Sequence, residues 1–300
     1  MRAFYENRTY NSEIHLSAFR AKNMNFVAHW HSELEILYVC EGRIGVGLNS
    51  EYRVLESGDI SVCGSNDIHY YDSEGMTSNT LVIVFRPEIL GSFSFRHGIP
   101  NPCSAFIDRA YRDNAKAAPG MSGDIKNALE KVITEMREEK ELYPGFSRLE
   151  ILRVFLLLFR HFPAYRADSQ KAGGGNRMPA DIGPMQKALK YIEDNYSQEL
   201  SLERIAGEAN LSRFYFSRLF RKTTGMNFNA YLARVRIEKA AELIGATGRT
   251  ITEIAYETGF SSIRTFNRAF RGIMGCAPQS LRKTRSIGKN EVLTRSDAHF

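Results

Sequence analysis

The chain has 300 residues, 43% of them hydrophobic and 25% charged, with a formal net charge of +6. This length allows two ordinary domains. The sequence lacks the roughly eighteen consecutive apolar residues of a membrane-spanning helix, and its first residues, MRAFYENRTYNSE, lack the apolar core of a secretory signal. The four cysteines lie far apart without a C-x-x-C pair, which argues against a disulfide framework or a cysteine zinc site and indicates reduced thiols in a cytoplasmic protein.

The positive charge is concentrated in the last part of the chain. From Met185 onward there are 19 Lys and Arg against 11 Asp and Glu, and 19 − 11 gives +8, so the preceding part carries −2. Such asymmetry suggests that only the basic part meets a polyanion, usually a nucleic acid. A solvated basic surface is the plainer explanation of the same charge.

The segment from about Asn23 to Pro87 predicts a β-rich domain. Its short apolar runs are rich in β-branched and aromatic residues and are separated by Gly, Asn, Ser and Asp. The runs are FVAHW, LEILYVC, RIGVGL, YRVL, DISVCG and TLVIVF. Many short strands without alternating helices favour a barrel or a sandwich.

Two helices are expected after these strands, one marked by apolar residues from Ile125 to Met136 and one over Leu149–Phe162, after the breaker Pro144-Gly145. Both helices would cover the barrel. An apolar stripe left uncovered would instead pair with a second subunit, and the pattern alone leaves both explanations open.

A polar, Gly-rich stretch, RADSQKAGGGNRMPADIG, predicts a flexible linker between the two halves. The residues after it are periodic at helical spacing throughout. The expected helices run from Met185 to Tyr196, Leu202 to Ala209 after a Ser201 cap, Ser212 to Thr223, Phe228 to Ile244, Ile251 to Thr258 and Ser261 to Ile273. The last residues, KTRSIGKNEVLTRSDAHF, have no periodicity and predict a frayed tail.

The helical part contains a repeat, because ANLSRFYFSRLFRKTTG and GFSSIRTFNRAFRGIMG share a turn, a Ser and an Arg-x-Phe-Arg-like run before a Gly. A helix, a short turn and a second helix is the helix-turn-helix arrangement, whose second helix enters a DNA major groove. Helical spacing turns one set of residues to the core: Phe216, Leu219, Phe220, Phe266, Ala269 and Phe270.

The opposite faces carry the candidate DNA-binding residues. Arg pairs with guanine, Ser and Thr bond several base edges, and Phe214 and Ile263 would meet thymine methyl groups. Capping serines would place phosphates at helix N-termini, and Arg221, Lys222 and Arg271 would hold the backbone. The full set is Ser212, Arg213, Phe214, Ser217, Arg218, Arg221, Lys222, Ser261, Ile263, Arg264, Thr265, Arg268 and Arg271. The alternative for any one of these arginines is an ordinary solvated charge on a helix surface that binds nothing specific.

Nearly all of the last 110 residues resemble the AraC/XylS-type transcription regulators. The matching positions are Ile205-Ala206, Leu211-Ser212, Ser217 to Lys222, Gly225, Arg236-Ile237, Ala240, Leu243-Ile244, Ile254-Ala255, Gly259-Phe260, Phe266, Arg268, Phe270-Arg271, Gly275 and Pro278. The resemblance implies two helix-turn-helix units bridged by one helix, reading successive major-groove faces about 34 Å apart. Leu281 departs from it, where the family often has Tyr.

The first half carries the pattern His29-x-His31-x-x-x-Glu35, followed by Gly42, Gly58 and His69. This resembles the first cupin motif closely and the second in part, because Gly64, Asn66 and Ser73 replace the usual residues. The resemblance implies a cupin-like β-barrel, and the same pattern is similar to the effector domains of AraC-type regulators.

Three interpretations of these polar residues stay open. They hydrogen-bond a small polar effector, with Tyr38 or Trp30 as an aromatic wall; they bind a divalent metal through His29, His31, Glu35 and His69; or the histidines satisfy buried groups. We take the first as the prediction, with effector-binding residues His29, His31, Glu35, Tyr38 and His69 and no cofactor, and keep the metal as its alternative.

The predicted architecture is a multidomain α and β chain. Residues 1–165 form a cupin-like β-barrel with two covering helices that binds the effector and dimerises, 166–184 a linker, 185–285 an all-α tandem helix-turn-helix domain, and 286–300 a tail. The segment before Asn23 is, by family analogy, a moving arm. The expected function is sequence-specific, effector-responsive transcription regulation, without enzymatic activity, in the cytoplasm on the nucleoid. The expected partners are double-stranded promoter DNA, a small-molecule effector, a second copy of the chain and, by family analogy, RNA polymerase; no membrane is expected.

Three other functions compete with this one. A metal-dependent cupin enzyme carrying a DNA-binding module needs bound metal and turnover. A DNA-repair protein would need a reactive zinc-bound cysteine cluster, which four scattered cysteines do not favour. A ligand-blind architectural protein would leave about 180 residues without a role.

Overall fold

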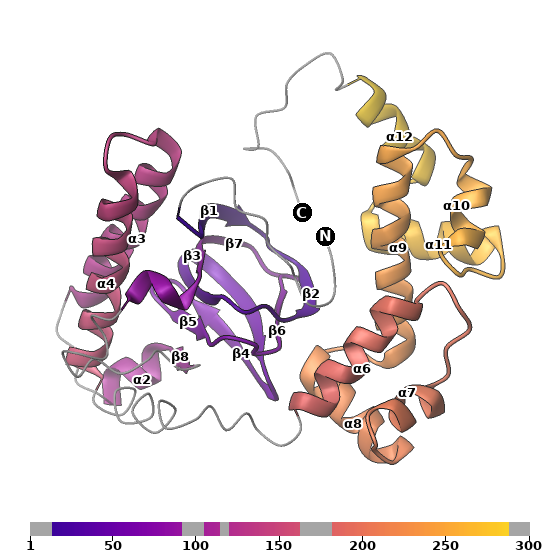
Figure 1. Ribbon diagram of the computed structural model, residues 1–300, viewed down its shortest axis with the longest axis horizontal. Helices are drawn as coiled ribbons and strands as arrows, with labels where there is room; N and C mark the ends of the chain where they lie inside the picture. The colour runs from indigo at the N-terminus through magenta and orange to yellow at the C-terminus, as the bar shows by residue number, and fades with distance from the viewer. Residues whose placement is uncertain (1–13, 92–104, 115–119, 163–181, 288–300) are drawn as a thin grey trace. The chain divides into compact units, whose positions relative to one another are not determined.

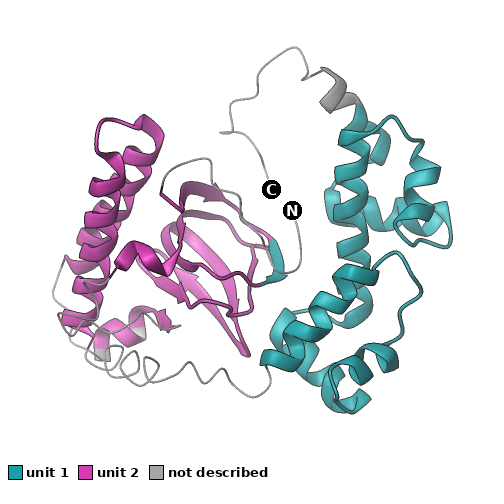
Figure 2. Cartoon of the chain, in the orientation of Figure 1, with its two compact units in different colours: residues 1–6, 26–29, 181–300 teal, residues 7–25, 30–180 magenta. Residues whose placement is uncertain are grey.

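The computed structural model describes residues 14–91, 105–114, 120–162 and 182–287 (Figure 1). The chain folds into two compact units (Figure 2). Among the described residues, the helical unit comprises Phe26–His29 and 182–287, and the β-rich unit comprises 14–25, 30–91, 105–114 and 120–162. Within the described ranges, no helix is both long and apolar enough to cross a membrane.

In the described part of the chain the sheet has eight strands, and the long central strand pairs antiparallel with each of its neighbours. The strands are β1 (Leu16–Lys22), β2 (Phe26–His29), β3 (Leu34–Leu48), β4 (Glu51–Glu56), β5 (Ile60–Cys63), β6 (His69–Asp72), β7 (Ser78–Phe85) and β8 (Ala105–Ile107). The order is β1-β7-β3-β5-β8, with β4 and β6 on β3 and β2 on β6. The central strand β3 pairs with β5 and β7 in its first half and with β4 and β6 in its second, so it joins the two parts of the sheet.

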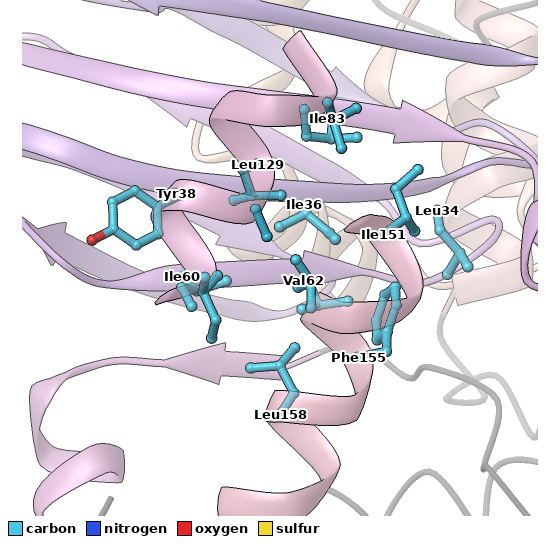
Figure 3. Close-up of a cluster of buried hydrophobic side chains, with 14 of the residues drawn as sticks. Leu34, Ile36, Tyr38, Ile60, Val62, Ile83, Leu129, Ile151, Phe155 and Leu158 are labelled. Carbon is cyan, nitrogen blue, oxygen red and sulfur yellow. The ribbon is translucent and has the colours of Figure 1, made fainter. Parts of the chain in front are cut away.

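Side chains alternate along β3, and one set builds the main core. Ile36 and Tyr38 lie on the face covered by α3 (Met121–Glu138) and α4 (Tyr143–His161), where Leu129, Phe155 and other helix side chains pack against them (Figure 3). Successive strand residues point to opposite faces, so Glu35 and Leu37 turn to the other side of the sheet. The two helices therefore cover one face, as the sequence predicts, and the polar residues lie on the other.

Several boundaries in this unit differ from the prediction. Strand β1 pairs with β7 and lies in the segment before Asn23, which family analogy assigns to a moving arm. Strand β8 and the short helix α2 (Arg109–Asn114) have no counterpart in the prediction, and the short 3-10 helix η1 (Pro87–Leu90) follows β7. Pro144 lies in the first turn of α4 instead of before it, because a helix N-terminus needs no donor at that position.

The second unit is helical in every regular element from residue 182 to the end of the described range. Its helices are α6 (Ile182–Asn195), α7 (Leu202–Glu208), α8 (Arg213–Thr224), α9 (Phe228–Ala246), α10 (Ile251–Glu257), α11 (Ile263–Met274) and α12 (Pro278–Ile287). Side-chain caps start five of them: Ser201, Ser212, Asn227, Thr250 and Ser262. Thr250 and Glu253 form a full capping box. Helix α9 packs against both α8 and α11, which joins the two repeats.

Three predictions in this unit need correction. The cap of α11 is Ser262, not Ser261, because Ser262 accepts the hydrogen bond from Thr265 N at 3.2 Å. Helix α6 begins at Ile182, inside the predicted linker, since Ile182 is buried. Helix α12 continues to Ile287, beyond the predicted start of the tail. Most of the predicted linker and the rest of the tail lie outside the described residues.

Candidate nucleic-acid interface and buried histidine cluster

Helix α8 separates a buried from an exposed face. Phe216, Leu219 and Phe220 are buried, and the Phe216 and Phe220 rings contact one another with centroids 5.4 Å apart. The candidate DNA-binding residues of this helix and its cap are all exposed, and Phe214 is 87% exposed. They are Ser212, Arg213, Phe214, Ser217, Arg218, Arg221 and Lys222, and those that would contact bases are called the reading residues below. The exposed Phe214 ring thus gives the start of this helix an apolar group beside its basic side chains.

Two contacts on α8 orient the reading residues. Arg213 forms an ion pair with Glu203 of α7 at 2.9 Å. The guanidinium of Arg218 lies 5.6 Å from the centroid of the Tyr215 ring. The exposed Arg213–Glu203 pair adds little stability in water, which leaves Arg213 available to another anion.

Helix α11 repeats the arrangement with fewer basic groups. Phe266 and Phe270 are buried, and Arg264, Thr265, Arg268 and Arg271 lie on the outer side of the helix. Ile263 is half-buried and packs against the core, unlike Phe214 in the first turn of α8. The two helices thus present different chemistry on equivalent faces, which suits the reading of two different DNA segments.

The sheet, in which β2 pairs with β6 and β6 with β3, brings four of the five predicted effector-binding residues together. His29, His31, Glu35 and His69 each offer a ligand atom, and these atoms all lie within 4.8 Å of one another. The four side chains are 0–2% exposed. His31 Nε2 lies 3.2 Å and His69 Nε2 3.6 Å from the same oxygen, Glu35 Oε2. A site this closed and this small suits a single atom better than an organic molecule.

The fifth residue, Tyr38, lies elsewhere. It is in the core on the opposite face of β3, where its hydroxyl contacts Ser122 Oγ at 3.0 Å (Figure 3). The reason is the period of the strand, since residues 35 and 38 differ by an odd number and face opposite sides.

Backbone carbonyl groups orient the three histidines in the same way. The Nδ1 atoms of His29, His31 and His69 lie 3.0, 3.2 and 2.9 Å from the carbonyl oxygens of Val27, Glu33 and Asp67. A carbonyl oxygen only accepts, so each Nδ1 carries a proton.

A neutral ring that donates from Nδ1 keeps a lone pair on Nε2. The Nε2 lone pairs of His31 and His69 then point at an oxygen of the Glu35 carboxylate, and two hydrogen-bond acceptors without a proton between them repel each other. Either a proton on a ring or a cation between these atoms resolves that conflict.

The carboxylate of Glu35 is held as an anion. Burial alone raises its pKa, but the hydrogen bonds of His31 and His69 outweigh that effect and place this pKa well below its ordinary value. Burial lowers the pKa of His69, and the Glu35 carboxylate reverses the shift and raises it. The Tyr71 hydroxyl donates to Glu35 Oε1, and burial together with this carboxylate raises the pKa of Tyr71 well above its ordinary value.

Sequence reasoning missed Tyr71. It lies two residues after His69 in β6 and therefore on the same face of the strand, which is the signal that would have found it. It also missed Cys63, whose buried thiol has a raised pKa because of desolvation and the nearby Glu35 charge. Cys40, Cys63 and Cys276 are free thiols in the described part of the chain.

Known proteins resemble the chain in both parts. A family model of the AraC-like ligand binding domain matches residues 13–155, and a model of a helix-turn-helix domain matches residues 205–284. The Regulatory protein PocR of Salmonella typhimurium is 40% identical over 99 residues, 33% of this chain and 33% of that protein. The HTH-type transcriptional activator RhaS of Escherichia coli O1:K1 is 23% identical over 266 residues, 89% of this chain and 91% of RhaS.

Among solved structures, an AraC-type DNA-binding-domain regulator from Chromobacterium violaceum is 28% identical, with a TM-score of 0.34, and covers 35% of this chain and 93% of its own. The two family models confirm the predicted β-rich ligand-binding part and the helix-turn-helix part, in that order. The named relatives are regulators. In both parts the chain is similar to AraC/XylS-type transcription regulators, with a match to an AraC-like ligand-binding domain followed by a match to a helix-turn-helix domain.

Proposed function

We propose that this regulator reads promoter DNA with α8 and α11 and that a small molecule bound to the β-rich unit changes this binding, in the cytoplasm on the nucleoid. The observation that carries the proposal is the repeat itself. Each helix sets exposed Arg, Ser or Thr side chains over a buried Phe pair, and each begins at a capping Ser. An exposed helix of this kind fits a major groove.

The side chains suggest a division of labour. Arg218 and Arg268 occupy matching positions on the outer sides of the two helices and are our choice for contacts to guanine. Phe214 supplies an apolar group for a thymine methyl. Arg221, Lys222 and Arg271 lie in the last turns, where they fit phosphate oxygens. The effector changes DNA binding only if it binds one arrangement of the regulator more tightly than another. The DNA-bound regulator would then act on transcription through contact with RNA polymerase.

The test is binding of the full-length protein to tiled DNA fragments from around its own gene at a stated salt concentration. We expect one fragment to bind tightly, and Arg218→Ala or Arg268→Ala to weaken it by about 1–3 kcal/mol. Lys190→Ala removes the same charge from α6, where Lys190 pairs with Asp194 at 3.5 Å, and serves as the control. Equal binding to all fragments, with the variants changing only the salt dependence, would contradict the assignment.

We also infer that His29, His31, His69 and Glu35 hold a divalent transition metal. Imidazole nitrogens and a carboxylate are the ligands that zinc, iron, nickel and cobalt accept. The carbonyl bonds at the Nδ1 atoms support this inference, because they orient ligands in the way that metal-bound histidines are usually oriented. The metal would fix the inner strands of the ligand-binding domain.

Elemental analysis of the purified protein and the visible spectrum of its cobalt-substituted form test this inference. We expect about one equivalent of metal in the native protein and its loss in His31→Ala. His161→Ala, at the end of α4, is the control and should keep the metal. A metal-free native protein that binds no cobalt would contradict the site.

The metal-binding residues also raise the alternative of a metal-dependent cupin enzyme with a DNA-binding module. A substrate must reach the metal, and the four ligating side chains are 0–2% exposed. This burial supports a structural ion in a regulator over a catalytic one.

We further propose that α4 joins two copies of the chain. One line of side chains on α4 and the residue before it repeats at alternating steps of four and three: Leu142, Phe146, Leu149, Arg153, Leu156 and Arg160. The four apolar members are 43–69% exposed. A spacing of 3.5 residues is the seam of a two-helix coiled coil.

Charge favours an antiparallel pair. Glu139 and Glu141 are exposed next to the start of this seam, where Glu138 already pairs with Lys140 at 2.6 Å and with Arg137 at 3.4 Å, and Arg153 and Arg160 lie in its second half. An antiparallel partner puts each basic half against an acidic end, whereas a parallel partner puts like charges together. Leu149→Glu should convert a dimer to a monomer in sedimentation experiments, and Val54→Glu, on exposed β4, should not. A monomeric native protein would contradict this proposal.

A further inference from the structure

The β-rich unit contains a second polar site, separate from the histidine cluster. A cavity of about 590 Å³ lies among the middle of β3, the β4–β5 and β6–β7 turns, and α2. Its lining residues are Gly42, Arg43, Glu56, Ser57, Asp59, Gly75, Met76, Thr77, Arg109 and Arg112. That volume is in the range of small-molecule sites, roughly 300–1,000 Å³.

One wall of the cavity is rigid and already neutralised. The Arg112 guanidinium donates to Gly58 O at 2.6 Å and lies 2.8 Å from Asp59 Oδ1, and its side chain is 17% exposed. The other carboxylate oxygen, Asp59 Oδ2, accepts from Glu56 N at 2.8 Å. The charges of Arg112 and Asp59 therefore neutralise each other, and both side chains are also hydrogen-bonded to the backbone of the β4–β5 turn.

Two other guanidinium groups of the lining have no such partner. Arg43 and Arg109 are exposed, and neither side chain makes a hydrogen bond or ion pair with a described residue. Arg43 stands opposite Glu56 in the β3–β4 register, yet no ion pair joins the two side chains. Opposite charges in such a cross-strand pair ordinarily attract one another, so their separation leaves two cations and one carboxylate free to meet a ligand.

From this arrangement we infer that the cavity binds a small organic anion, a carboxylate or a phosphate ester, as the effector of the regulator. A guanidinium takes a carboxylate or phosphate through two parallel hydrogen bonds, and two guanidinium groups that have no partner among the described residues supply that recognition twice at one cavity. Glu56 supplies an acceptor for a hydroxyl or ammonium group of the same molecule. The regulatory meaning of this site rests on the proposed function; the binding site itself does not.

The histidine cluster does not compete for this ligand. Its four ligand atoms lie within 4.8 Å of one another and its side chains are buried, so an organic anion has no room among them. The site that sequence reasoning assigned to the effector and the site proposed here thus use different residues. Arg43, Arg109 and Arg112 carry no motif, because they come from β3 and α2, and only folding brings them together.

Isothermal titration calorimetry of the full-length protein tests the site with named probes. The probes are inorganic phosphate, glucose 6-phosphate, citrate and L-glutamate, with glucose as the uncharged comparison. We expect at least one anion to bind and glucose not to bind. Citrate or glutamate binding without either phosphate identifies a carboxylate ligand, and the reverse result identifies a phosphate ester.

Arg43→Gln and Arg109→Gln should each weaken the binding of that anion at least about tenfold. Arg20→Gln is the matched control, because Arg20 is an exposed arginine of the same unit paired with Glu130 at 2.8 Å and lies outside the cavity. The variants change exposed side chains, and unaltered thermal unfolding would show that they fold. No binding by any anion, or equal binding by an Arg43→Gln/Arg109→Gln double variant, would overturn the proposal.

The same preparations separate this proposal from the proposed function. Specific DNA binding without anion binding removes the site and leaves the DNA-reading assignment intact. Anion binding lost in the arginine variants, with DNA binding unaltered by the anion, keeps the site and removes its regulatory coupling.

Discussion

At the scale of single residues, the position of the Glu35 carboxylate in the histidine cluster depends on a neighbour that the sequence motif does not contain. Tyr71 donates to the oxygen of Glu35 that does not face the histidines, so it fixes the carboxylate against the cluster. Side chains that orient metal ligands commonly change metal affinity when they are removed. A tyrosine inside a strand is easily overlooked in the sequence, although its spacing of two residues from His69 is visible there.

We therefore predict that Tyr71→Phe weakens metal binding about 10–100-fold. Competition with a chelator of known affinity measures the change. Tyr70→Phe is the matched control, because the Tyr70 ring stacks on Tyr52 with centroids 6.1 Å apart, on the other face of β6. Equal metal affinity in the two variants would show that Tyr71 does not position Glu35.

A second residue-scale prediction concerns Gly42, which follows the register shift between Val39 and Glu41 in the β3–β7 pairing. Gly42 has φ of 71°, and a Cβ there would overlap the carbonyl oxygen of Thr77. Gly42→Ala should lower the free energy of unfolding by at least about 1–3 kcal/mol in urea denaturation. At Gly75, φ is 67° but a Cβ meets nothing within 4 Å, so Gly75→Ala isolates the backbone strain and should cost less. Equal losses would rule out the steric explanation.

At the scale of elements, local chemistry determines where each recognition helix starts. Ser261 and Ser262 are adjacent, and the sequence does not decide between them. In the structure Ser262 Oγ accepts from Thr265 N, and its hydroxyl also donates to Thr265 Oγ1 at 3.0 Å. Ser262→Ala should cost about 1 kcal/mol of unfolding free energy and Ser261→Ala less than about 0.5 kcal/mol, measured by thermal unfolding. The reverse order would place the cap at Ser261.

The helices are easier to predict than the strands for a physical reason. Buried pairs such as Phe216–Phe220 and Phe266–Phe270 recur at helical spacing and mark the core face directly. Strand β1, LSAFRAK, is half-exposed and carries two basic residues, so its alternation is weak. Its place depends on β7, more than fifty residues away, which local propensity does not see.

The same difference between local and long-range signals separates the histidine cluster from the arginine-lined cavity. The histidine cluster is visible as a motif because His29, His31 and Glu35 come from one short segment. The arginine-lined cavity is not visible, since Arg43 and Arg109 are 66 residues apart and each reads as an ordinary surface charge. The assignment of Tyr38 to the effector site is wrong because it gives nearness in sequence more weight than the strand period.

At the scale of the whole molecule, a dimer would connect two sets of recognition helices. Linking two binding units raises apparent affinity by roughly 10²–10⁴ without any new DNA contact. Leu149→Glu should therefore weaken binding to a paired site much more than to an isolated half-site, as measured by titration of both DNA duplexes. Val54→Glu should leave both affinities unchanged. An equal loss on both duplexes would indicate damage to the reading helices instead of lost dimerisation.

The central claim is that one chain reads two adjacent stretches of DNA with two related but different helices. Base-by-base interference mapping of the bound operator tests it most directly, for the native protein, Arg218→Ala and Arg268→Ala. We predict two groups of essential bases about one helical turn, roughly 34 Å, apart, with each variant abolishing the interference of one group and sparing the other. A single group of essential bases, or an equal weakening of both groups in each variant, would contradict the account.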